Sequence, residues 1–116
     1  MIKNILITGA DGQDGKIILN KLHNQKINLF LIAKNFENKI IKKNVRYLKF
    51  NLNKKKTLEN FFKKNRIDII LHLASNNPNF RQNNYKKHYL ENINNSKNLI
   101  NFSTKYNKKI KFISCS

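Results

Sequence analysis

Short apolar runs alternate with longer amphipathic segments along the whole of this 116-residue chain. The apolar runs occupy residues 2–8, 27–33, 45–50, 68–74 and 110–115. Between them, apolar residues recur every three or four positions in residues 15–25, in 54–66 and from about 85 to 106. Short apolar runs indicate buried strands, and the helical spacing indicates helices that cover them. The alternation therefore predicts an α/β fold with a parallel sheet in a single domain.

Right-handed crossovers would arrange the predicted strands as a doubly wound, Rossmann-type sheet with strand order 3-2-1-4-5. In such a sheet, ligands bind beyond the carboxyl ends of the strands, where the order reverses between the first and the fourth strand. Four separate stretches fall at those ends: residues 9–15, 33–35, 51 and 73–75. We expect these stretches to line one groove.

All three glycines of the chain lie between residues 9 and 15, directly after the first apolar run. A strand, glycines at a spacing of three and then a helix are typical of a phosphate-binding turn. Gly9 would allow a sharp turn, Gly12 would let the backbone approach a pyrophosphate, and Gly15 would let the helix pack closely on the strand. Glycines also form ordinary loops, but the place of these three after the first strand favours a cofactor site over a plain loop.

The stretch "TGADGQDG", in which Thr8 precedes Gly-x-x-Gly-x-x-Gly, resembles the extended short-chain dehydrogenase/reductase family. This family contains the NAD-dependent epimerases and dehydratases of nucleotide sugars. The stretches "DIILHLAS", "ENINNSKNLINFS" and "IKFISCS" also resemble its motifs, so the likeness covers the whole chain. It implies that residues 1–116 are the N-terminal portion of an NAD(P)-binding domain, incomplete at the C-terminus and without the substrate region. The implied cofactor-binding residues are Thr8, Gly9, Gly12, Gln13, Asp14, Gly15, Lys34, Asn51, Leu52, Leu73, Ala74 and Ser75.

Within that family, Gln13 and Asp14 resemble the turn of the GDP-mannose 4,6-dehydratases, which reads Thr-Gly-x-x-Gly-Gln-Asp-Gly. Most epimerases of the family carry apolar residues at these two positions. The fourth apolar run ends in "HLAS", whereas the dehydratases carry an Asn-Leu-(Gly/Ala)-Ala-Gln ending there. The resemblance thus implies a nucleotide-sugar 4,6-dehydratase, a lyase, with a 4-epimerase or another epimerase/dehydratase as the alternative.

The end of the second predicted strand bears on the choice of nicotinamide cofactor. NAD-specific folds place an acidic residue there to bind the ribose 2′-hydroxyl, whereas this chain has Lys34 and Asn35. A lysine would attract a 2′-phosphate, so NADP is favoured, with NAD as the alternative because Glu37 lies close by. Asn51 and Leu52 resemble an Asp-Leu pair that contacts adenine in relatives. His72 is expected to orient or pack at its strand end and not to catalyse.

The resemblance also implies a catalytic tyrosine followed four residues later by a lysine, and none of the four tyrosines in this chain has one. The catalytic serine or threonine of the family would fall just after Ser116, or on Ser116 itself if the register slips by one. We therefore expect no other catalytic residue in residues 1–116 and no turnover by this chain alone. A non-catalytic NAD(P)-binding module is the alternative from another functional class.

The formal net charge is +18, which raises the possibility of a nucleic-acid partner. Lysine, asparagine and isoleucine make up about half of the chain, however, and all three have A/T-rich codons. The lysines are spread over every segment, so we expect a solvated surface and no specific nucleic acid. One cysteine and three scattered histidines predict no internal disulfide and no metal site.

No apolar run approaches the length that spans a bilayer, and the N-terminus does not resemble a signal peptide. We therefore expect a cytoplasmic protein without a membrane partner. The family resemblance implies a nucleotide-sugar substrate and a homo-oligomer for the full-length enzyme.

Overall fold

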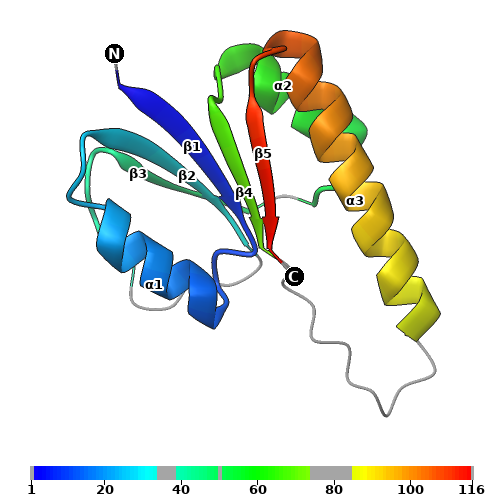
Figure 1. Ribbon diagram of the computed structural model, residues 1–116, viewed down its shortest axis with the longest axis horizontal. Coiled ribbons are helices and arrows are strands. Elements are labelled where there is room, and N and C mark those ends of the chain that lie inside the picture. The colour runs from blue at the N-terminus through cyan, green and yellow to red at the C-terminus, as the bar shows by residue number, and fades with distance from the viewer. Residues whose placement is uncertain (1, 34–38, 50, 74–84, 116) are drawn as a thin grey trace.

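The computed structural model describes residues 2–33, 39–49, 51–73 and 85–115, which form a parallel sheet with helices on both faces (Figure 1). The strand order is β3-β2-β1-β4-β5, as predicted. The chain order is β1 (Lys3–Thr8), α1 (Gln13–Leu22), β2 (Ile27–Ile32), β3 (Val45–Leu48), α2 (Lys55–Lys64), β4 (Ile69–Leu73), α3 (Tyr85–Tyr106) and β5 (Lys111–Cys115). The described part is thus a Rossmann-like α/β fold.

Helix α1 differs most from its predicted bounds, beginning at Gln13 instead of Gly15 and ending at Leu22 instead of near Gln25. It begins early because the N–H of Lys16 donates to the carbonyl of Gly12 at 3.1 Å, which is the first helical hydrogen bond. It ends early because the N–H of Gln25 donates to Leu22 at 3.0 Å, in a turn that leads into β2. Apolar spacing could not mark the start of α1, because its first turn is polar.

The parallel pairing fixes one row of residues across the carboxyl ends of the strands. From β3 to β5, this row consists of Leu48, Ile32, Thr8, His72 and Ser114. Residues that pair directly across neighbouring strands point to the same face of a sheet. Thr8 and His72 are therefore neighbours on one face, although they lie 64 positions apart in the sequence.

The two faces of the sheet carry separate cores, because α1 covers one face and α2 and α3 cover the other (Figure 1). On the α1 face, Ile7 and Leu31 are almost completely buried. On the opposite face, Leu6 and Ile70 lie beneath Leu58 of α2 and Leu99 of α3, and all four side chains are fully buried. Burial of these apolar side chains on both faces stabilises the layered arrangement.

Helix α3 is much longer than the strands that it covers. Its 22 residues span about 33 Å at the rise of an α-helix, whereas the longest strands, of 6 residues, span about 20 Å. Its C-terminal half is anchored in the core through Leu99, and its N-terminal half extends past the carboxyl ends of the strands (Figure 1). No helix in the described part of the chain combines the length and the hydropathy that crossing a bilayer requires.

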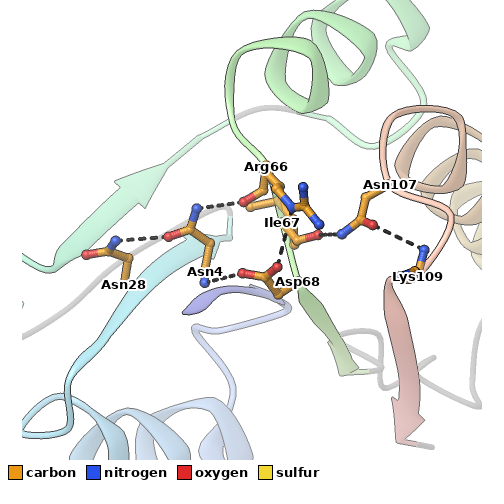
Figure 2. Close-up of polar contacts among 7 residues, drawn as sticks. All are labelled: Asn4, Asn28, Arg66, Ile67, Asp68, Asn107 and Lys109. Atoms are coloured by element: carbon orange, nitrogen blue, oxygen red, sulfur yellow. Dashed lines mark hydrogen bonds and ion pairs between the residues drawn. The ribbon is translucent and has the colours of Figure 1, made fainter. Parts of the chain in front are cut away.

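Polar side chains form hydrogen bonds at the opposite end of the sheet, where the strands begin (Figure 2). The backbone N–H of Asn4 in β1 donates to Oδ2 of Asp68, and the N–H of Asp68 donates to the carbonyl of Asn4, both at 2.9 Å. The Asn4 side chain donates to the carbonyl of Arg66 at 2.6 Å and accepts from Asn28 of β2 at 2.9 Å. Asp68 therefore caps the start of β4 by joining it to β1.

Candidate functional site

The order of the strands reverses between β1 and β4. The chain leaves β1 towards β2 and β3 on one side, and it leaves β4 towards β5 on the other. Helix α1, which follows β1, covers one face, and α3, which follows β4, covers the opposite face. The helices that follow these two neighbouring strands therefore lie on opposite faces, so the switch point of the sheet is at the carboxyl ends of β1 and β4. This is the position at which doubly wound sheets bind ligands.

The glycine turn follows β1 at this position. Gly9 has a φ of 66°, in the left-handed region that favours glycine. The N–H of Gly12 donates to the carbonyl of Gly9 at 3.2 Å, which closes the turn. The N–H of Ala10 donates to the carbonyl of Ile32 at 3.3 Å and ties the turn to the end of β2. Gly9 thus reverses the chain over the end of β1, which is the role predicted for it.

Gly15 is a packing position. A Cβ atom at Gly15 would lie 2.4 Å from the carbonyl oxygen of Ala10 and 2.6 Å from its Cα, closer than real Cβ contacts. Both atoms belong to the backbone and cannot rotate away. Gly15 therefore allows α1 to lie directly against the backbone of the preceding turn at Ala10.

Gly12 differs from the other two glycines, because nothing in the described fold requires a glycine there. Its φ of −76° and ψ of 173° suit any residue, and a Cβ would meet only the Gly9 oxygen at an ordinary distance of 3.5 Å. Gly12 is exposed and immediately precedes α1, whose first-turn N–H groups have no partners within the helix. It also lacks a side chain to cap those groups. The bare backbone and the positive end of the helix dipole therefore suit an approaching anion.

The other predicted cofactor residues occupy different environments. Gln13 and Asp14 are exposed in the first turn of α1, and Asn51 is exposed after β3. Leu52 is partly buried against the core beneath α2 and α3, and Leu73 is buried in the core on the α1 face. Lys34, Ala74, Ser75 and Ser116 lie outside the described residues.

Thr8 and His72 form a polar pair at the carboxyl ends of β1 and β4. Thr8 Oγ1 lies 2.5 Å from His72 Nδ1, and Thr8 is 1% exposed. The His72 ring also lies against Phe112 of β5, with ring centroids 5.8 Å apart. Burial lowers the pKa of His72, which keeps the ring neutral near pH 7. His72 thus packs at its strand end, as expected, but its bond to Thr8 was not foreseen, and only the register of the two strands could have indicated it.

Stability should depend on pH through His72. Because the folded chain holds the pKa of this ring below its ordinary value of about 6.5, the unfolded chain binds the proton more readily. Wild-type protein should therefore lose more unfolding free energy than His72→Asn between about pH 7.5 and about pH 5.5. Urea denaturation at both pH values measures the difference. Identical pH profiles for the two proteins would contradict the prediction.

The chain matches one known protein family over nearly its whole length. Residues 5–116 match the model of the NAD dependent epimerase/dehydratase family. The chain belongs to this family. Members of this family are NAD-dependent epimerases and dehydratases. No curated protein sequence matches the chain significantly.

Several solved structures share the fold. An epimerase from Methanothermobacter thermautotrophicus has a TM-score of 0.82 and 22% identity, covering 97% of this chain and 34% of that one. The UDP-glucose 4-epimerase from Thermotoga maritima, solved with UDP-glucose, has a TM-score of 0.78 and 23% identity, covering 96% and 37%. WbmG from Bordetella bronchiseptica, solved with NAD, has a TM-score of 0.81 and 17% identity, covering 98% and 37%. At these identities the likeness shows the fold alone, and the chain spans about a third of each structure.

Proposed function

We propose that residues 1–116 bind a nicotinamide dinucleotide as the cofactor-binding portion of a nucleotide-sugar 4,6-dehydratase resembling GDP-mannose 4,6-dehydratase. The observation that carries the dinucleotide site is Gly12, a glycine that the fold does not require, exposed at the positive end of α1. Gln13 and Asp14, exposed beside it, support the dehydratase. The complete enzyme would convert GDP-mannose to GDP-4-dehydro-6-deoxy-mannose and water.

Each part of the site would hold one part of the dinucleotide. Gly9 shapes the turn, and the backbone at Gly12 together with the first-turn N–H groups of α1 would bind the diphosphate. The turn that carries Asn51 and Leu52 would lie beside the adenosine, and Lys34 would bind the 2′-phosphate of NADP. The bound nicotinamide would supply the chemistry by accepting a hydride from the sugar and returning it.

A nucleotide-sugar 4-epimerase is the second candidate. It is supported by the similar folds of UDP-glucose 4-epimerases and by His72, which stands where the dehydratases carry asparagine. Both activities need the Tyr-x-x-x-Lys pair, which residues 1–116 do not contain, so we propose that they alone have no turnover. Reading the coding DNA downstream of Ser116 for this pair tests that point. Product analysis of a protein containing the pair, with GDP-mannose and with UDP-glucose, would separate dehydration from inversion at C4.

Cofactor choice gives a direct test of the proposed site. Wild-type protein should bind NADPH more tightly than NADH in isothermal titration calorimetry, because Lys34 would pair with the 2′-phosphate. Replacing Lys34 by glutamate should weaken NADPH binding about tenfold or more, since a hydrogen bond to a charged group contributes about 1.5–3 kcal/mol. NADH affinity should change much less.

Lys64→Glu is the matched control, because it changes the net charge equally at the exposed C-terminal end of α2. It should leave both affinities unchanged. Tighter binding of NADH than of NADPH by the wild type would reject the choice of NADP. If neither dinucleotide binds, the proposed function itself fails.

A further inference from the structure

The turn after β3 follows the shortest strand, at the edge of the sheet. Strand β3 has four residues and pairs only with β2 among the described strands. After it, the N–H of Lys54 donates to the carbonyl of Asn51 at 3.2 Å, and α2 begins at the next residue. Asn51 is exposed in this turn, whereas the side chain of Leu52 packs against the core. A turn that follows a short edge strand needs support from another layer to keep a fixed position.

Helix α3 supplies that support through one side-chain amide. Nδ2 of Asn98 donates to the carbonyl oxygen of Leu52 at 3.1 Å, across 46 residues of sequence. The next residue, Leu99, is fully buried in the core beneath α2 and α3. Because Leu99 is held in the core, the position and rotation of α3 are fixed at Asn98. The side-chain amide of Asn98 is therefore held in place to donate to the Leu52 carbonyl. Because the bond is partly buried, its loss would leave a carbonyl without this partner where water has limited access.

Backbone hydrogen bonds link the end of β3, which precedes this turn, to the end of β2 and from there to the glycine turn. The N–H of Ala33 donates to the carbonyl of Leu48 at 3.3 Å, and the N–H of Ala10 donates to the carbonyl of Ile32, also at 3.3 Å. These bonds set the spacing between the ends of β1, β2 and β3. The hydrogen bond from Asn98 to Leu52 then fixes the orientation of the turn relative to the ends of these three strands.

We propose that Asn98 is a positioning residue for the adenosine end of the dinucleotide site: its amide holds the turn at Leu52 so that Asn51 faces the cofactor. This inference rests on the proposed function. Asn98 itself does not contact the cofactor, since its amide is directed at the Leu52 carbonyl. Its effect should therefore fall on the adenosine part of the ligand.

The chain contains a matched control for this bond. Nδ2 of Asn107, just after α3, donates to the carbonyl of Ile67 at 2.9 Å, at the amino-terminal edge of the sheet (Figure 2). Both bonds join an asparagine amide to a loop carbonyl, but only Asn98 lies on the side of the proposed site. Asn98→Leu and Asn107→Leu each remove an amide without adding charge, and Asn98→Gln retains a donor.

The test measures the dissociation constants of AMP and NADPH by calorimetry, together with thermal unfolding, for the wild type and these variants. Asn98→Leu should weaken the binding of AMP and the binding of NADPH by the same factor, about tenfold, because the adenosine end of the site loses a fixed contact surface. Asn98→Gln should recover part of that loss. Asn107→Leu should lower the melting temperature but leave both affinities unchanged.

Three results would overturn the inference. Asn98→Leu could lower the melting temperature without changing either affinity, which would make the bond purely structural. It could weaken the binding of NADPH but not that of AMP, which would place the effect away from the adenosine. The wild type could bind NADPH without measurable affinity for AMP, which would show that the adenosine end is not anchored. Absence of both NADPH and NADH binding to the wild type is a separate result, because it rejects the proposed function.

Discussion

Replacing Gly15 by alanine is expected to lower the free energy of unfolding by about 3 kcal/mol, because the new methyl group overlaps backbone that cannot move aside. The added Cβ would lie 2.4 Å from the Ala10 oxygen, so that either α1 or the glycine turn must shift. That turn is tied to β2 through the N–H of Ala10, so the strain would spread into the sheet. Urea denaturation monitored by far-UV circular dichroism measures the loss.

Ile17→Ala is a suitable control in the same helix, because Ile17 is 47% exposed and its truncation removes little buried surface. Its unfolding free energy should stay within about 1 kcal/mol of the wild type. A Gly15→Ala protein as stable as this control would show that α1 does not lie as close to Ala10 as the structure has it.

Gly12→Ala is expected to show the opposite behaviour, with nearly normal stability and strongly weakened dinucleotide binding. Its backbone angles suit alanine and its Cβ would make only an ordinary contact, so unfolding free energy should change by less than about 1 kcal/mol. The methyl group would stand where the diphosphate is proposed to meet the backbone. We therefore expect NADPH affinity to fall about 10- to 100-fold in calorimetric titration, as for lost hydrogen bonds to a charged group.

Together, the two glycine variants separate folding from binding within a turn of seven residues, 9–15. If Gly12→Ala keeps full affinity, the diphosphate does not approach the backbone at this position. If Gly12→Ala instead unfolds, the glycine has a structural role that the described contacts do not account for.

The order of elements could be predicted from the sequence because each element carries its own periodic signal. Strand β1 contains a continuous buried apolar run at residues 5–7, and Leu58, Phe61 and Phe62 recur at helical spacing and indeed form the buried side of α2. The start of α1 could not be predicted in the same way, because its first turn is polar and lies against backbone. A close contact between Gly15 and Ala10 has no apolar signature in the sequence.

The candidate site was predictable only in part. The glycine spacing identified the turn, and the family resemblance supplied Asn51 and Leu52 as candidate cofactor-binding residues. The bonds from Thr8 to His72 and from Asn98 to Leu52 join residues 64 and 46 positions apart. Thr8 and His72 meet because of the strand register, and Asn98 reaches Leu52 because Leu99 anchors α3 in the core. Neither condition is visible in a local pattern.

The sequence by itself determined the fold class, the strand order and the position of the glycine turn, because apolar periodicity and turn chemistry act over a few neighbouring residues. The glycine pattern suggested a role for each glycine, but the tertiary structure alone decided that the fold requires a glycine at positions 9 and 15 and does not require one at position 12. That distinction depends on distances between atoms of separate elements, such as the 2.4 Å and 3.5 Å that a Cβ would meet at Gly15 and Gly12. The packing of α1 against the turn therefore excludes a side chain at Gly15 but not at Gly12.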